Sequence, residues 1–443
     1  MTSVHTDPPQ TSRLRRLTQI TRKDVTRLGH TGVPHVFAAL VGTQGMSMIQ
    51  RILLARILSE AELGQMTYVM TILAVVVVVA DLGICTALLK FASEPVSAEQ
   101  KRRLYVACLL CSAVSTALTT LLYLAALLML GVGPQDRALR GYMLLVIPYI
   151  PLAALAGSPL LFMQARKEIK RSARYTVITQ LIGLVLVIGA TYRWKLPGYF
   201  VTVSVAPLVN LVLLLAVTRA HLGWLWPSLA LVKKLVSFGF ISMLANATGH
   251  VNAAAAIVLM RHLGVPDAQI GVYAVALLVA SGTRLLPDSL MRVAFPYLSG
   301  LLHVPRQMRA RQRELALKQC AFVAAAAAVW LLVGFWVIRL VFGQRYGGGY
   351  WPSVVLLCGL IPYAISAPFQ HGMIILNAVK LNLGVALVQL TTNVVLCLLL
   401  IPRAGIVGAA AAVTGTQVVG STLAIIATRV VVDRRIAAEQ QAS

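Results

Sequence analysis

Long apolar segments separated by short polar stretches follow one another along the sequence from about residue 33 onward. Each is close to the roughly 20 residues that an α-helix needs to cross the hydrocarbon core of a bilayer. None alternates polar and apolar residues as a membrane β-strand does. The pattern predicts twelve helices, at 33–54, 66–89, 104–130, 139–163, 175–192, 196–217, 235–260, 271–299, 316–341, 351–376, 381–401 and 405–427.

Composition supports the same fold class. Hydrophobic residues make up 58% of the chain and charged residues only 12%, whereas about 25% of the residues of a soluble domain are charged. We therefore expect an all-α integral membrane protein with about twelve transmembrane helices.

The sequence also repeats itself at a distance of 205 to 214 residues, close to half its length. A parallel repeat of this kind in a membrane chain predicts two homologous six-helix lobes with a site between them. The recurring pairs are Leu54-Ala55-Arg56 and Leu259-Met260-Arg261, Leu63-Gly64 and Ile270-Gly271, Ile147-Pro148-Tyr149 and Ile361-Pro362-Tyr363, Gln164 to Lys167 and Asn377 to Lys380, and Gly198 to Thr218 and Gly408 to Thr428.

The repeat divides the chain into five expected parts. They are a basic N-terminal segment (1–32), an N-lobe with helices 1 to 6 (33–219), a linker between the lobes (220–234), a C-lobe with helices 7 to 12 (235–430) and a tail (431–443). Apolar residues within 14–28 fall near one helical face, so this segment is either a helix on the membrane surface or a disordered basic tail.

The formal net charge of +25 predicts topology rather than nucleic-acid binding. With a cytoplasmic N-terminus, 27 of the 39 Lys and Arg residues fall on cytoplasmic segments and 9 on the opposite side. This bias predicts that both termini are cytoplasmic. A nucleic-acid-binding protein would gather its basic residues on a folded soluble domain, and the polar segments here are too short to form one.

The sequence carries no pattern that indicates an enzyme, a metal site or a cofactor. There are only 14 acidic residues, and phosphate-binding loops and nucleophile elbows are absent. All six cysteines fall inside predicted helices without the spacing of metal ligands, which is typical of apolar packing.

Ionisable residues at membrane depth are the strongest candidates for function. A charge at the centre of an inserted helix costs at least about 2.5 to 3.5 kcal/mol, so it normally faces a partner or a wet cavity. Asp81 lies in the second predicted helix, and Arg284, Asp288 and Arg292 share one stripe of the eighth. When Gly64 is aligned with Gly271, Asp81 falls on Asp288, so the two aspartates are predicted to be equivalent positions that serve in ion coupling or in structural ion pairs.

Two interpretations of the arginine stripe remain open. Arg284 and Arg292 could bind an anionic headgroup between the lobes, because guanidinium groups form bidentate hydrogen bonds with phosphate oxygens. Alternatively, Asp288 neutralises one of them in an intrahelical pair that serves packing. We take the first interpretation as the working hypothesis.

Three further residues are candidates for a substrate cavity. Arg51, near the end of the first helix, either reaches the membrane interface or points into a cavity. His250 and Asn252 place polar atoms in the seventh helix, where hydrogen bonding between helices is the alternative explanation.

Several stretches resemble polysaccharide flippases of the Wzx type, which belong to the multidrug/oligosaccharidyl-lipid/polysaccharide exporter superfamily. The resemblance rests on the order of motifs that together cover nearly the whole membrane region. These motifs are Arg51 to Gly64, Ala80-Asp81-Leu82-Gly83, Lys90-Phe91-Ala92, Gly271-Val272-Tyr273-Ala274, Phe295 to Ser299, Leu340 to Tyr346 and Leu400 to Ala410.

The resemblance implies two six-helix lobes that alternate between inward-open and outward-open states. It also implies a substrate, an undecaprenyl-diphosphate-linked oligosaccharide that is moved across the bacterial inner membrane, and partners among membrane lipids and the proteins that polymerise or assemble polysaccharide. The chain departs from the family at Leu278, where many relatives carry arginine, and at Ala255, where an acidic residue is frequent. Proton coupling through an acidic group at position 255 is therefore not expected.

Three alternatives to this function stay open at this point. They are a flippase for lipid II, a cation-coupled exporter of drugs or metabolites from the same superfamily, and a scaffold of a polysaccharide assembly complex that transports nothing. The excess of arginine argues against the exporter, because cationic drugs would require acidic cavity residues.

Overall fold

The computed structural model describes residues 33–94, 96–129, 136–221, 227–301, 305–376 and 378–442, and every regular element within them is helical. The expected surface helix within 14–28 lies outside these residues. The elements are α2 (Val33–Ile57), α3 (Glu60–Asp81), α4 (Ile84–Ser93), α5 (Ala98–Leu128), α6 (Arg137–Leu145), α7 (Tyr149–Ala165), α8 (Ile169–Thr218), the 3-10 turn η1 (Arg219–His221), α9 (Leu229–His262), α10 (Asp267–Gly300), α11 (Pro305–Val341), the 3-10 turn η2 (Gln344–Gly349), α12 (Tyr350–Ile375) and α13 (Val379–Ala442).

Two of these helices are hairpins of two membrane spans each. In α8 the backbone leaves the helical region at Lys195 (φ 53°, ψ −139°), and in α13 it does so at Gly405 (φ 53°, ψ −128°). The two breaks are 210 residues apart, as the repeat predicts. Added Cβ atoms on Gly198 and Gly408 would lie 2.4 and 2.1 Å from the carbonyl oxygen eight residues earlier, so only glycine fits where each chain folds back.

Two of the helices predicted as continuous are broken in the structure, so this part of the prediction was wrong. The segment predicted at 66–89 ends as α3 at Asp81 and restarts as α4, because Leu82 and Gly83 adopt the left-handed conformation. The segment predicted at 139–163 is divided into α6 and α7 by a turn before Tyr149. Apolar residues continue across both breaks, so hydropathy alone shows one segment in each case.

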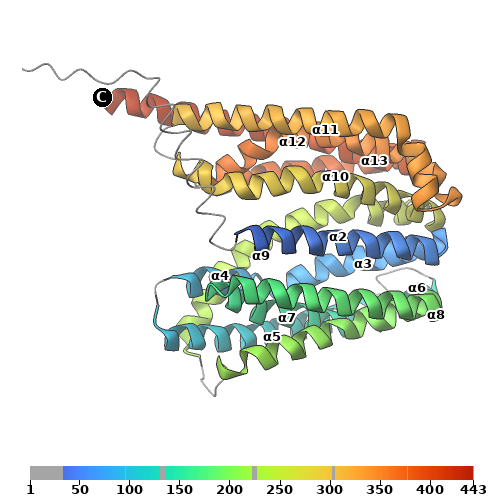
Figure 1. Cartoon of the computed structure of the whole chain (residues 1–443), viewed down its shortest axis with the longest axis horizontal. Helices are drawn as coiled ribbons and strands as arrows, with labels where there is room; N and C mark the ends of the chain where they lie inside the picture. The colour runs from blue at the N-terminus through green and yellow to red at the C-terminus, as the bar shows by residue number, and fades with distance from the viewer. Residues whose placement is uncertain are drawn as a thin grey trace, which may run out of the picture.

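The helices form two lobes side by side, with α2 to α8 in the N-lobe and α10 to α13 in the C-lobe (Figure 1). Helix α9 crosses between them and contacts α4 and α5 of the N-lobe as well as α13 of the C-lobe. We call the end of the bundle where α2 begins and α13 finishes the terminal end, and the end where α2 finishes the distal end.

Near the distal end, α3 and α10 cross in backbone contact. An added Cβ on Gly64 would lie 1.9 Å from the carbonyl oxygen of Asp267, and one on Gly271 would lie 2.0 Å from that of Glu60. These four residues pair in the register of the repeat, 207 positions apart. The contact is therefore reciprocal, as across a two-fold axis.

Near the terminal end, the break between α3 and α4 packs against α9. Gly83 approaches Gly239 so closely that an added Cβ would lie 2.1 Å from its carbonyl oxygen. About two turns after Gly83, Phe91 meets Phe238, which directly precedes Gly239; the two rings pack edge to face with their centroids 5.5 Å apart. Lys90 lies 4.1 Å from the Phe238 ring, and Lys234 lies 4.3 Å from the Phe91 ring, so α4 and α9 are packed closely together at this end.

Candidate functional site

A cavity of about 470 Å³ lies between the two lobes, in the region between the two glycine contacts. Helices α2 and α3 supply one wall and α9 and α10 the other, with Tyr199 from α8 at one side. We call it the interlobe cavity. Its polar lining residues are Ser47, Gln50, Arg51, Thr67, Thr71, Tyr199 and His250, and the remainder of the lining is mostly alanine and larger aliphatic residues.

Helical periodicity explains why these side chains share one cavity. Ser47, Gln50, Arg51 and Leu54 are spaced by three or four residues, which places them on one face of α2. Thr67 and Thr71 have the same relation on α3. The cavity therefore has a polar stripe on its N-lobe wall and a more apolar wall on the C-lobe side.

Arg51 is the one arginine that lines this cavity. Its side chain is exposed, and among the residues that the structure describes no carboxylate pairs with it. Arg51 therefore lies in a cavity, which is one of the two positions left open by the sequence. A guanidinium without a partner at membrane depth is costly unless water or an anion replaces the missing partner.

His250 lines the cavity from α9 and is likewise exposed. It faces the same space as Arg51, so the structure brings together two of the five predicted substrate-binding residues. The other described candidates lie elsewhere.

Arg284 and Asp288 form an ion pair on α10, with the arginine Nε 3.3 Å from the aspartate Oδ2. Tyr363 of α12 completes the group. Its hydroxyl donates to Asp288 Oδ1 at 2.6 Å and accepts from Arg284 Nη2 at 3.0 Å, while its ring lies 4.2 Å from the guanidinium carbon. Both charged side chains keep about 40% exposure (44% and 38%). The pair is held within the C-lobe but remains open to ligand or solvent.

Asp81, the sequence equivalent of Asp288, has different surroundings. It is the last residue of α3, and its carboxyl group faces the backbone amides of Gly83 and Cys85 across the helix break. The other carboxylate oxygen, Oδ1, is buried and has no partner among the described residues. The two aspartates match in sequence position, but only Asp288 is paired with a cation.

Asn252 joins α9 to the C-lobe instead of facing the interlobe cavity. Asn393 of α13 is buried, and its amide donates both to the carbonyl oxygen of Asn252 at 2.8 Å and to the Asn252 side-chain oxygen at 2.9 Å. Hydrogen bonding between helices, the alternative for Asn252, is thus what the structure contains. The side chain of Arg292 lies outside the described residues.

Replacing Asn252 with alanine should lower stability rather than change substrate handling. The buried Asn393 amide would keep its bond to the backbone but lose the side-chain acceptor, and a buried donor without its partner costs about 1 to 3 kcal/mol. The expected result is a lower melting temperature of the purified protein in detergent, with transport per folded molecule unchanged. A loss of transport at unchanged melting temperature would instead assign Asn252 to the substrate.

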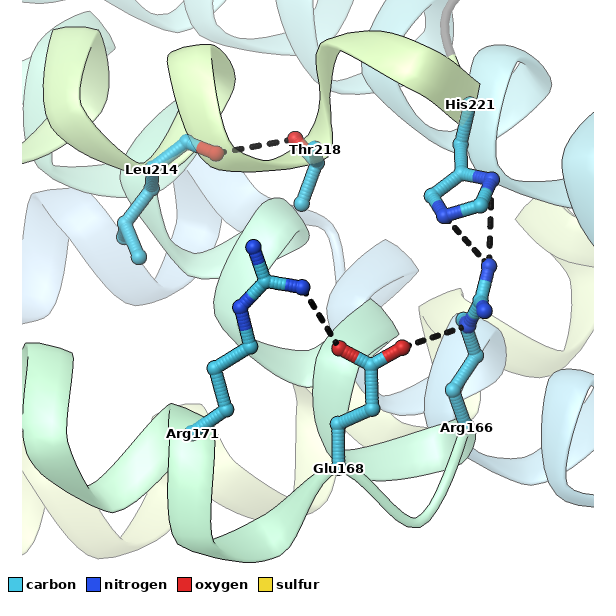
Figure 2. Close-up of polar contacts among 6 residues, drawn as sticks. All are labelled: Arg166, Glu168, Arg171, Leu214, Thr218 and His221. Atoms are coloured by element: carbon cyan, nitrogen blue, oxygen red, sulfur yellow. Dashed lines mark hydrogen bonds and ion pairs between the residues drawn. The ribbon is translucent and has the colours of Figure 1, made fainter.

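A cluster of polar residues ties the terminal end of the N-lobe together (Figure 2). Glu168 bridges Arg166 at 2.9 Å and Arg171 at 3.3 Å, and Arg166 Nη1 lies 3.0 Å from His221 Nδ1. Because arginine only donates, the imidazole accepts this bond. The cluster joins α7, the start of α8 and η1, so it fixes the ends of these helices.

Among the described residues, no group of His, Cys, Asp or Glu side chains is arranged to hold a metal ion. Tyr363 was not predicted as a partner of Arg284 and Asp288. The motif Ile361-Pro362-Tyr363 was recognisable in the sequence, but only because it recurs. Gln50, Thr67 and Thr71 carried no distinguishing signal, since small polar residues are common in membrane helices.

Taken together, two helical lobes around a central cavity with an unpaired cation define a multi-pass membrane transport protein. Residues 32–302 match the model of the family described as "Polysaccharide biosynthesis protein". The chain belongs to this family, and a curated relative of the chain is a transport protein.

The chain is similar in sequence to one curated relative and in fold to two solved structures. The chain is 26% identical over 344 residues to the succinoglycan biosynthesis transport protein ExoT of Rhizobium meliloti (strain 1021), covering 75% of this chain and 67% of that protein. Its fold is similar to that of the lipid II flippase MurJ in an inward closed conformation, with a TM-score of 0.72, 13% identity and coverage of 89% and 87%. It is also similar to an inward-facing multidrug resistance MATE family transporter of the MOP superfamily, with a TM-score of 0.67, 14% identity and coverage of 90% and 96%.

Proposed function

We propose that the protein is a flippase that moves an undecaprenyl-diphosphate-linked oligosaccharide across the bacterial inner membrane by alternating access. The observation that carries the proposal is the unpaired guanidinium of Arg51 in the interlobe cavity. A diphosphate is a suitable partner, because arginine binds phosphate oxygens through bidentate, charge-assisted hydrogen bonds.

The rest of the cavity fits the remainder of such a substrate. Hydroxyl and amide groups of Ser47, Gln50, Thr67 and Thr71 offer donors and acceptors to sugar hydroxyls. Apolar surfaces exposed on the outside of both lobes face the bilayer, where a polyprenyl tail can remain while the headgroup crosses. Membership of the polysaccharide biosynthesis family and the likeness to a succinoglycan transport protein support the same substrate class.

In this proposal the terminal end is cytoplasmic and the distal end faces the periplasm, in agreement with the excess of Lys and Arg on the terminal side. The linked glycan would enter from the cytoplasmic leaflet and leave toward the outer one. Reporter fusions at residue 443 and between residues 129 and 136 would test this orientation, since a periplasmic C-terminus would reverse it.

The direct test is the fate of the lipid-linked glycan in a deletion strain. Deletion should cause the glycan to accumulate on the cytoplasmic face, and the wild-type gene should relieve it. Arg51→Ala should reduce relief at least about tenfold, since hydrogen bonds to a charged group contribute about 1.5 to 3 kcal/mol and 1.4 kcal/mol corresponds to tenfold. Arg51→Lys should retain part of the activity, because it keeps the charge without the bidentate geometry.

Arg403→Ala is a matched control, because Arg403 is an exposed arginine whose guanidinium, among the described residues, donates a hydrogen bond to the carbonyl oxygen of Leu399 on its own helix. It should complement fully. Normal polymer export by Arg51→Ala at wild-type protein levels would refute the assignment of Arg51. Accumulation of peptidoglycan precursors would point to lipid II, and drug sensitivity with intact glycan export would point to the exporter.

A further inference from the structure

We infer that Arg56 and Arg345 form a latch that holds the distal end of the interlobe cavity closed. The two residues lie on different lobes, and each caps the end of a helix that belongs to the other lobe. We call this pair of contacts the arginine latch. The inference concerns how the cavity is sealed and does not depend on which substrate occupies it.

The first half of the latch reaches from the N-lobe to the C-lobe. Arg56 lies in the last turn of α2. Its Nε donates to the carbonyl oxygen of Val341, the last residue of α11, at 2.6 Å, and its Nη2 donates to the carbonyl oxygen of Leu340. The last carbonyls of a helix have no partner within it, so they are natural acceptors for an arginine.

The second half runs in the opposite direction. Arg345 lies in η2 of the C-lobe, and one guanidinium nitrogen sits among three carbonyl oxygens at the end of α2. It donates to Ala55 at 2.9 Å, to Arg56 at 3.1 Å and to Leu58 at 2.7 Å. Each arginine therefore places positive charge at the negative end of a helix dipole across the lobe interface.

The latch lies directly beside the cavity wall. Ala55, whose carbonyl oxygen accepts from Arg345, also lines the interlobe cavity. Both arginine side chains are exposed. Water can therefore take over their hydrogen bonds when the lobes separate, so the contacts favour closure without making it irreversible.

Further contacts near the distal end also hold the lobes together. Gln65 of α3 donates to Asp267 of α10 at 3.0 Å, and the Arg261 guanidinium lies 5.2 Å from the Tyr68 ring. These join the lobes at one side of the Gly64 and Gly271 crossing. The latch differs from them because it ties the helix ends themselves, which must part if the cavity is to open distally.

The experiment measures access to the cavity from the distal side. A single cysteine replaces Ala274, a small cavity-lining residue of α10, in a protein whose six native cysteines are changed to alanine. Labelling by a membrane-impermeant maleimide is followed in vesicles of both orientations and in cells that lack the lipid-linked glycan. Arg56→Gln and Arg345→Gln should each raise the distal labelling rate roughly tenfold, as expected for a population shift on loss of a charge-assisted hydrogen bond.

Arg140→Gln is the matched control. Arg140 also donates to a helix-end carbonyl, that of Leu127, but both residues belong to the N-lobe. It should leave labelling unchanged. Arg345→Lys should fall between wild type and Arg345→Gln, because the lysine ammonium keeps the charge but ends one bond short of the Nη2 atom that makes these contacts.

The latch is refuted if both glutamine variants label at the parental rate while they elute as folded protein by size exclusion. It is also refuted if Arg140→Gln raises labelling to the same degree, since general loosening would then explain the result. Neither outcome bears on the flippase proposal, because no substrate takes part. Failure of Arg51→Ala to affect glycan transport would likewise leave the latch intact.

Discussion

Replacing Gly64 with alanine should open the distal end of the interlobe cavity and reduce transport at least about tenfold. The added Cβ would lie 1.9 Å from the carbonyl oxygen of Asp267 and 3.0 Å from the backbone nitrogen of Gly271. Backbone atoms cannot move aside by a change of rotamer, so the lobes must separate. Overpacking costs about 1 to 3 kcal/mol, and 1.4 kcal/mol corresponds to a tenfold change in population.

The effect should come from the lobe contact alone, because alanine is a better helix former than glycine. Gly45→Ala is the control, since nothing lies within 4 Å of an added Cβ on Gly45 of α2. The measurements are labelling of a cysteine at Ala274 from the distal side and glycan transport in cells. Parental labelling and transport by Gly64→Ala would contradict the role of this contact in closure.

Arg284→Ala and Asp288→Asn should have unequal effects if the C-lobe pair contributes to anion binding. Arg284→Ala removes the cation and should lower glycan transport at least about tenfold. Asp288→Asn keeps the cation and releases it from its carboxylate, so transport should persist. A buried pair would lose about 3 to 5 kcal/mol on removal of either partner, but side chains with 44% and 38% exposure are screened by water, so the cost in stability is much smaller.

Tyr363→Phe tests how much the position of the Arg284 guanidinium matters, apart from its charge. It removes the hydroxyl that contacts both Arg284 and Asp288 but leaves the ring beside the guanidinium. Transport should fall less than in Arg284→Ala. If all three variants lose protein level together and transport per molecule stays constant, the group serves structure only, which was the alternative for the arginine stripe.

Hydropathy and the internal repeat were sufficient to predict the helical class and the hairpins at Lys195 and Gly405. The repeat was informative because each half needs the same backbone reversal at the same place. The breaks at Gly83 and before Tyr149 were not predictable in this way. A helix in a bilayer can end and restart within an apolar run when another helix packs against the break, as α9 does at Gly239.

The sequence was sufficient to single out candidate residues but not to show which of them lie together. Arg51, His250 and Arg284 were recognisable because charge or polarity at membrane depth is rare. Their separation into an interlobe cavity and a C-lobe pair depends on which face each helix turns to its neighbours. Asn252 illustrates the limit, since the residue that holds it, Asn393, lies 141 positions away on α13.

The reciprocal contact between Gly64 and Gly271 also bears on how the chain arose. Gly64 approaches Asp267 and Gly271 approaches Glu60, and the two contacts are equivalent under the repeat. A symmetric homodimer shows the same pattern of contacts. Two separate copies of a six-helix ancestor could have made this contact before their genes were joined. On this account the distal contact between the lobes is inherited from the ancestor.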